Sequence, residues 1–180
     1  MDPRKLLLQK KELPAGGKYR VPNEGWMSPH TNSEIVSAWT IEEGQAYLAE
    51  TGRIHGWIVI YKRGTSSVVM PDEVLDNVAL YSNAEGAQLV VTKYGARGLP
   101  ETGFHEIEAP EIGDVARAFQ KTVQARTWLR LNFTYRNVFH SIELYGSEQD
   151  VSMDFAVELA NTLLTGLKQL PLSSKVQFVP

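Results

Sequence analysis

The chain has 180 residues, a formal net charge of −3, and a composition that is 43% hydrophobic and 22% charged. These values are typical of a single globular domain and argue against a general nucleic-acid-binding protein. The absence of cysteine excludes disulfide bonds, thiol nucleophiles and cysteine metal ligands. No apolar run approaches the roughly 20 residues of a membrane-spanning helix. We also expect no signal peptide, because Leu6-Leu7-Leu8 is too short for its apolar region and Lys10-Lys11 follow at once.

Residues 1–33 are expected to form an extended N-terminal segment, and residues 34–180 a single domain. Proline and glycine interrupt the segment repeatedly, and Trp26 and Met27 are expected to anchor it. Residues 1–20 have a net charge of +4, which leaves −7 for the rest of the chain. The basic side chains are Arg4, Lys5, Lys10, Lys11, Lys18 and Arg20. A segment of this kind can contact a membrane surface or an acidic partner, or it can simply be solvated.

The first half of the domain is predicted to contain a helix followed by strands. Thr40 and Glu43 form a capping box, and the helix that they begin is expected to end near Thr51, before Gly52. Residues 53–62 are apolar on both sides, which predicts a central strand. Residues 68–70 begin a second strand that Pro71 interrupts, and residues 73–81 continue it.

The elements that follow alternate between helix and strand. Ser82 and Glu85 form a second capping box, which predicts a helix to about Tyr94, ended by Gly95. Residues 104–108 and 115–122 are predicted strands, separated by a turn. Ser152 caps the last helix, whose apolar positions recur at three- and four-residue steps up to Leu170, before Pro171.

A hairpin is predicted between Trp128 and Tyr145, with its turn at Arg136-Asn137. One face then consists of four predominantly apolar pairs, Leu129–Leu144, Leu131–Ile142, Phe133–His140 and Tyr135–Val138. The other face pairs Trp128 with Tyr145, Arg130 with Glu143, Asn132 with Ser141 and Thr134 with Phe139. Aromatic and opposite-charge pairs across strands stabilise a hairpin, so this register is favoured. Arg-Asn is a weaker turn sequence than Asn-Gly, and a longer turn remains open.

This order of elements, without a repeated strand–helix–strand rhythm, predicts an α+β domain. We expect an antiparallel sheet with helices packed on one face.

Several short motifs resemble those of a known group of proteins. Leu6-Leu7-Leu8 with Glu12-Leu13-Pro14-Ala15-Gly16 is similar to the opening of bacterial exported lipoproteins and sensor-like extracytoplasmic domains. Ile112-Gly113-Asp114, the stretch 133–138 and the helix at 154–167 resemble their core and C-terminal helix, although Arg136 stands where relatives more often have glycine. The layout also resembles the Mog1/PsbP-like fold of accessory and binding proteins. The resemblance implies an extracytoplasmic location and no catalytic residues.

No arrangement of chemically reactive residues indicates an enzyme. His105 lies on the opposite face of its strand from Glu106 and Glu108, so a metal site there would need a second histidine, for example His55. His140, opposite Phe133, is either a ligand or pH-sensitive group, or a partly buried histidine with one hydrogen bond. The acidic residues Asp72, Glu73, Asp76, Glu111 and Asp114 are interpreted as solvated turn residues, with a hydrolytic pair as the alternative. We expect no catalytic residue, metal or cofactor.

The most distinctive surface is aromatic. If helices cover only one sheet face, the other exposes a set of aromatic side chains with one arginine, namely Trp57, Tyr61, Trp128, Arg130, Phe139 and Tyr145. Exposed aromatic residues with arginine are common in protein interfaces. The sequence therefore favours a non-enzymatic binding or accessory module that docks a protein partner through this face. The alternative is a small-molecule-binding domain with an apolar pocket between sheet and helices.

Overall fold

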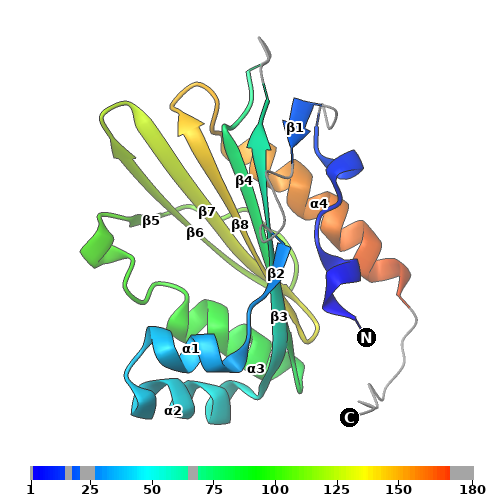
Figure 1. Ribbon diagram of the computed structural model, residues 1–180, viewed down its shortest axis with the longest axis vertical. Helices are drawn as coiled ribbons and strands as arrows, with labels where there is room; N and C mark the ends of the chain where they lie inside the picture. The colour runs from blue at the N-terminus through cyan, green and yellow to red at the C-terminus, as the bar shows by residue number, and fades with distance from the viewer. Residues whose placement is uncertain (1, 15–17, 21–26, 65–68, 171–180) are drawn as a thin grey trace.

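The protein is described by a computed structural model, in which residues 2–14, 18–20, 27–64 and 69–170 are placed well enough to describe. An eight-stranded antiparallel sheet forms its centre (Figure 1). The strand order is β1-β3-β4-β8-β7-β6-β5, and β2 also pairs with β3. The strands are β1 (Tyr19–Arg20), β2 (Met27–Pro29), β3 (Arg53–Arg63), β4 (Glu73–Tyr81), β5 (His105–Ile107), β6 (Val115–Val123), β7 (Arg126–Tyr135) and β8 (Val138–Ser147).

The predicted hairpin is confirmed as β7 and β8. All eight predicted cross-strand pairs are present, from Trp128 opposite Tyr145 to Tyr135 opposite Val138. The turn is the short one, and its first central residue, Arg136, adopts φ +56°. The neighbouring β6–β7 turn also has two central residues, Gln124 and Ala125, both with positive φ, which suits the right-handed twist of the paired strands.

One face of the sheet is covered by helix α4 (Met153–Gln169) together with the N-terminal segment (Figure 1). This segment contains two short 3-10 turns, η1 (Pro3–Leu6) and η2 (Lys10–Glu12). Leu6, Leu7 and Leu8 are at most 6% exposed and share a core with the apolar side of α4. The described part of the N-terminal segment is thus built into the domain core.

The opposite face is also covered by helices, but only at one end. Three helices lie there, α1 (Asn32–Ala38), α2 (Ile41–Thr51) and α3 (Ala84–Leu89), and α3 continues as the π-helical turn η4 (Val90–Tyr94) (Figure 1). They bury a second core that contains Ala79 and Phe139 from the sheet. The α+β antiparallel fold is as predicted, but helices pack on both faces. The reason is that β4 and β8 carry apolar residues on both of their sides over this end.

Other predicted elements differ in detail. The capping box of Thr40 and the left-handed Gly52 at the end of α2 are confirmed. Helix α1 was not predicted, although Thr31 and Glu34 form a capping box at its start. Asn83, whose side chain accepts from the Gly86 amide, caps α3 in place of Ser82, because its carboxamide reaches the free amide of the first turn.

A few expectations concern residues that lie outside the predicted element or outside the described residues. Val69 and Met70 are outside the strands, and Gly95 has φ −61° and so does not end the helix in a left-handed conformation. Trp26, Val68 and Pro171 lie outside the described residues. Within the described part of the chain, none of the helices has the length and apolar character needed to cross a membrane.

Candidate functional site

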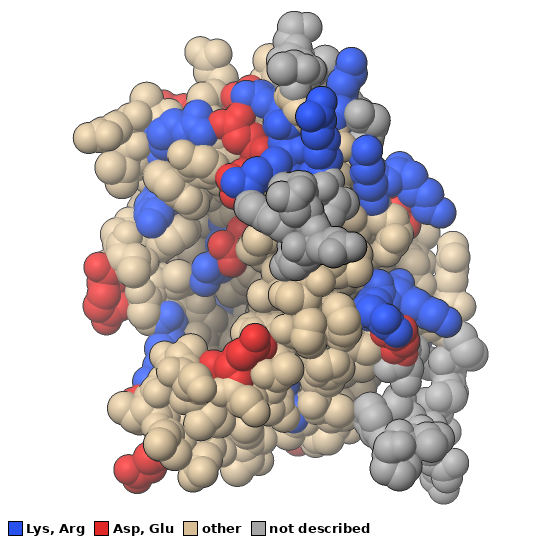
Figure 2. Space-filling model, viewed as in Figure 1, with Lys and Arg blue, Asp and Glu red and all other residues tan. Residues whose placement is uncertain are grey.

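The helices on the second face leave the rest of that face open, and a groove runs along it. Two adjoining cavities make up this groove, with volumes of about 360 Å³ and about 320 Å³. Leu75 of β4 and Glu143 of β8 line both of them. Figure 2 shows the hollow between the helical end and the far ends of the strands. We call this feature the sheet-face groove, with an inner end beside the helices and an outer end away from them.

The floor of the groove is set by the strand register. Side chains that lie opposite one another in a sheet share a face, so each register position places a row of residues across β6, β7, β8 and β4. The innermost row of the floor is polar and contains Arg117, Asn132, Ser141 and Asn77. The next row contains Phe119, Arg130, Glu143 and Leu75, and the outer row contains Lys121, Trp128, Tyr145 and Glu73.

Two polar atoms in this floor are buried without a hydrogen-bond partner among the described residues. They are Oδ1 of Asn132, a residue that is 3% exposed, and Nε of Arg130. Nη2 of Arg130 is engaged by Glu143 Oε1 at 2.8 Å, so only part of the guanidinium is satisfied. A buried polar group left unpaired costs roughly 1–3 kcal/mol. Since both residues line the cavity at the inner end, a bound molecule could supply the missing partners.

Two other buried side-chain atoms lack a partner in the described chain, but both lie away from the groove lining. Thr134 Oγ1 is beside Phe139, toward the helical end, and His140 Nε2 is on the opposite face of the sheet. The unpaired atoms that face the groove are therefore those of Arg130 and Asn132.

The inner end of the groove holds a buried arginine without a carboxylate partner among the described residues. Arg53 is 5% exposed, and its guanidinium donates to Asn32 Oδ1 and to the His30 carbonyl, both at 2.6 Å. Gly56 makes room for it, because a Cβ there would lie 2.4 Å from Arg53 Nη2. Burial, and then the charge of Arg53, lowers the pKa of His30, whose Nδ1 lies 3.4 Å from Asn77 Oδ1. This end thus combines a cation with a neutral imidazole.

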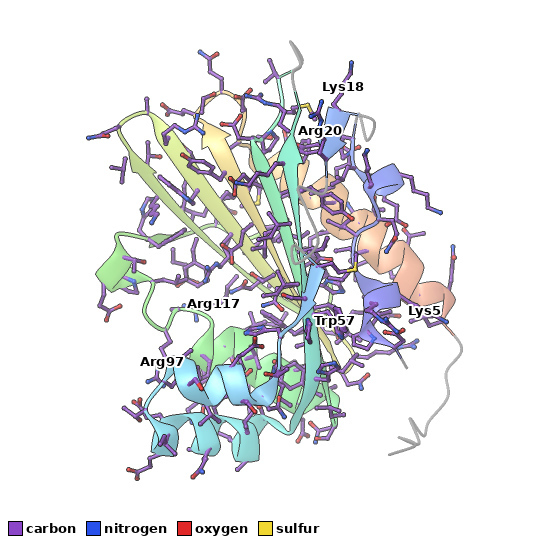
Figure 3. All side chains as sticks on the ribbon, viewed as in Figure 1. Lys5, Lys18, Arg20, Trp57, Arg97 and Arg117 are labelled. Carbon is purple, nitrogen blue, oxygen red and sulfur yellow. The ribbon has the colours of Figure 1, made fainter. Side chains whose placement is uncertain are left out.

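The outer end is aromatic. The rings of Trp128 and Tyr145 lie 4.6 Å apart, and Phe104 lines the same cavity. Lys121 Nζ lies 4.7 Å from the ring centroids of both Phe104 and Trp128, a distance at which cation–π attraction is favourable. Arg97 and Arg117, from the loop after η4 and from β6, lie near the helical end (Figure 3).

Of the six residues predicted to form one aromatic surface, four line the groove, namely Trp128, Arg130, Phe139 and Tyr145. Phe139 is on the same side of the sheet but is buried by the helices at its inner end. Tyr61 is in the core of the other face, where burial raises its pKa to about 12 and its hydroxyl donates to the Leu8 carbonyl at 2.7 Å.

Trp57 also belongs to the opposite face. It packs against the α4-side core, its Nε1 donates to His55 Nε2 at 2.9 Å, and the Arg4 guanidinium lies 5.3 Å from its ring. The expected single surface is therefore wrong for Trp57 and Tyr61. The reason lies in β4, where Val78 pairs with both Trp57 and His140, which fixes Trp57 on the side of His140 and away from Trp128.

The histidines and acidic residues form different contacts from those expected. Asp76 is wholly buried in the middle of β4, so its interpretation as a solvated turn residue is wrong. Its Oδ1 lies 2.9 Å from His140 Nδ1, and its Oδ2 accepts from the Leu8 amide at 2.9 Å. Asp72 pairs with Arg63 and Arg126, and Asp114 accepts from the Arg136 amide. Among the described residues no group of three or more histidine and acidic side chains could hold a metal ion.

Comparison with known proteins gives information on the fold. Neither a protein-family model nor a curated protein matches the chain. Among solved structures, the chain is similar to the extracellular domain of PknH from Mycobacterium tuberculosis, with a TM-score of 0.57 and 13% sequence identity over 93% of this chain and 95% of that one. The likeness confirms the α+β antiparallel fold and its resemblance to a bacterial extracytoplasmic domain. At this identity it shows the fold alone, and it does not support the Mog1/PsbP-like assignment.

Proposed function

We propose that this chain is a non-catalytic binding module that holds a small organic ligand in the sheet-face groove. The observation that carries the proposal is the pair of buried, unpartnered atoms on the groove floor, Arg130 Nε and Asn132 Oδ1. They are two residues apart on β7 and therefore face the same side. In the ligand-free protein both unpaired atoms reduce stability, so a ligand that forms hydrogen bonds with them stabilises the folded chain.

The lining defines the chemistry of this ligand. It needs an acceptor for Arg130 Nε and a donor for Asn132 Oδ1, because a guanidinium only donates and a carbonyl oxygen only accepts. Beside this polar pair, Leu75, Phe104 and Trp128 offer apolar and aromatic surface. The two cavities fall in the range of about 300–1,000 Å³ that is usual for small-molecule sites. A molecule with a polar head and a flat apolar body suits the groove.

The second candidate is the docking of a protein partner through the outer end of the groove. It is favoured by the Trp128–Tyr145 ring pair, which is only partly buried and lies beside Arg130. Tryptophan, tyrosine and arginine are the residues that most often dominate protein–protein binding energy. In this form the interface is limited to Trp128, Arg130 and Tyr145, without Trp57, Tyr61 or Phe139.

Ligand-induced thermal stabilisation tests the first candidate. The chain is screened against small molecules that have a hydrogen-bonding head and an aromatic body, and a ligand at 100 times its Kd adds about 2.7 kcal/mol to the free energy of unfolding. Asn132→Leu should abolish the response to a hit. Asn161→Leu, the same change at an exposed position of α4, should leave it intact.

Two results would count against a small-molecule site. One is a panel without any hit, and the other is a hit whose effect survives Asn132→Leu. If, in addition, a partner captured from the native host is lost in Trp128→Ala at unchanged thermal stability, the docking function is supported in its place.

We further propose that the module acts outside the cytoplasm. The fold it shares with the extracellular domain of PknH supports this location, as do the exported-lipoprotein-like motifs of the sequence. Membership of the Mog1/PsbP-like group remains a proposal of the same kind. Fractionation of native cells with an antibody against the chain tests the location, and recovery in the cytoplasmic fraction contradicts it.

A further inference from the structure

A second surface, on the N-terminal segment and at the β1 edge of the sheet, carries unpaired positive charge. It consists of exposed side chains from η1, η2, β1 and the residue just before β1, and we call it the N-terminal basic surface. Its members are Lys5, Lys10, Lys11, Lys18 and Arg20. None of them has an ion-pair partner among the described residues, whereas Arg63, Lys93, Arg97, Arg117, Arg126 and Arg130 all do.

The acidic residues of the same segment do not neutralise these cations. Asp2 is bound by Arg4 through both carboxylate oxygens. Glu12 closes the capping box of η2, where its Oε2 accepts from the Gln9 amide at 2.6 Å. The described part of residues 1–20 thus keeps its full excess charge of +4, beside a remainder of −7.

The backbone that carries the N-terminal basic surface is held in place. Leu6, Leu7 and Leu8 are buried in the core, and the Leu8 amide and carbonyl are bound by Asp76 and Tyr61. β1 is paired with β3, and the Tyr19 hydroxyl donates to the Pro71 carbonyl at 3.1 Å. The cations therefore project from a fixed segment and not from a free tail.

The cations gather along one side of the molecule. Figure 2 shows Lys and Arg side chains along the side that carries the N-terminal segment and β1, and Figure 3 places Lys5, Lys18 and Arg20 there. Arg20 lies opposite Lys62 in the β1–β3 pair, and Lys62 is itself paired with Glu73 at 2.8 Å.

We propose that the N-terminal basic surface binds anionic lipid headgroups at a membrane surface. A bilayer presents a negative plane to one side of the molecule only, which suits a basic side on a chain that is otherwise acidic. A single-stranded nucleic acid suits it less, because single strands bind where aromatic rings stack on the bases. The ring of Trp57, which packs beside this segment, is already covered by Arg4. The inference is independent of what the groove holds.

Vesicle co-sedimentation of the full chain tests the inference. The vesicles contain either phosphatidylcholine alone or phosphatidylcholine with 30% phosphatidylglycerol. Each basic residue near an anionic surface adds roughly five-fold to binding, so the triple variant K10Q/K11Q/K18Q should bind on the order of 100-fold more weakly. The control variant K93Q/K121Q/R136Q removes the same charge from other parts of the surface and should bind almost as well as the unmodified chain. Raising the salt from 50 to 300 mM should release the protein.

Three results would overturn the inference. The first is failure of the unmodified chain to sediment with the anionic vesicles at 50 mM salt, and the second is an equal loss of binding by the two triple variants. The third is retention on a DNA duplex with an affinity equal to that for the anionic vesicles, which would show unspecific attraction to polyanions. Circular dichroism spectra of both variants confirm that the comparison is made between folded proteins.

Discussion

Replacing Asp76 should destabilise the fold more than any change at a surface carboxylate. Its two oxygens serve two buried partners, the Leu8 amide and His140 Nδ1, each at 2.9 Å. Asp76→Ala leaves both groups without an acceptor in the core, at roughly 1–3 kcal/mol each. Together the two lost hydrogen bonds predict a destabilisation of roughly 2–6 kcal/mol. Against a total stability of about 5–15 kcal/mol for a domain, this loss is large.

Urea denaturation followed by tryptophan fluorescence measures the loss. The midpoint should fall markedly for Asp76→Ala and less for Asp76→Asn, which keeps one oxygen and the volume of the side chain. Asp154→Ala, at an exposed position in the first turn of α4, is the matched control and should cost less than about 1 kcal/mol through the helix dipole. Amide exchange at Leu8 should accelerate specifically in Asp76→Ala, because that amide loses its acceptor. A loss within 1 kcal/mol of the control would refute the role assigned to Asp76.

Three further predictions follow from contacts of the described residues. Tyr61→Phe removes the hydrogen bond to the Leu8 carbonyl and should cost about 1–2 kcal/mol in urea unfolding, with a smaller effect than Asp76→Ala. Gly56→Ala should destabilise by about 1–3 kcal/mol, since the new Cβ meets Arg53 Nη2 at 2.4 Å and the Val78 carbonyl at 2.8 Å, whereas Gly166→Ala in α4 meets nothing and should raise Tm by a few degrees. The lowered pKa of His30 means that the unfolded chain binds its proton more readily than the folded chain, so stability falls as the pH drops below about 6.5. His30→Gln should reduce that fall between pH 7.5 and 5, and equal pH profiles of both proteins would contradict the assignment.

The sequence predicts what depends on neighbouring strands and turns. The β7–β8 register could be read because both faces of the hairpin give meaningful pairs at once, and a shift by one residue would bring the apolar face to solvent. The long apolar stripe of α4 and the capping box of α2 are similarly local signals. Each of these features involves residues close together in the sequence, so the spacing of residue types is enough to predict it.

Distant pairings could not be read in this way. The alternation of residues shows which side chains share a face with Trp57 within β3, and which share a face with Trp128 within β7. Whether the two tryptophans lie on the same face of the sheet depends on how β4 pairs with β3 and β8. Asp76 is buried because Leu8 and His140, 68 and 64 residues away, meet it in the core. The leucines at residues 6–8 interrupt a charged stretch, and only the folded sheet shows what they pack against. The sequence does show a polar residue, Asn132, between the apolar residues Leu131 and Phe133 of a predicted strand. It does not show that the side-chain oxygen of Asn132 lacks a hydrogen-bond partner.

The shared core of the N-terminal leucines and α4 has a consequence for synthesis on the ribosome. Leu8 leaves the ribosome before Met153, the first residue of α4, which lies 145 residues further along the chain. At about 5–20 residues per second, the nascent chain carries its leucines without their final covering for roughly 7–30 seconds. During that time β4 also lacks β8, the strand with which it pairs in the folded sheet. The core can therefore be completed only after α4 has been synthesised, and residues 6–8 stay an apolar segment without its covering until then.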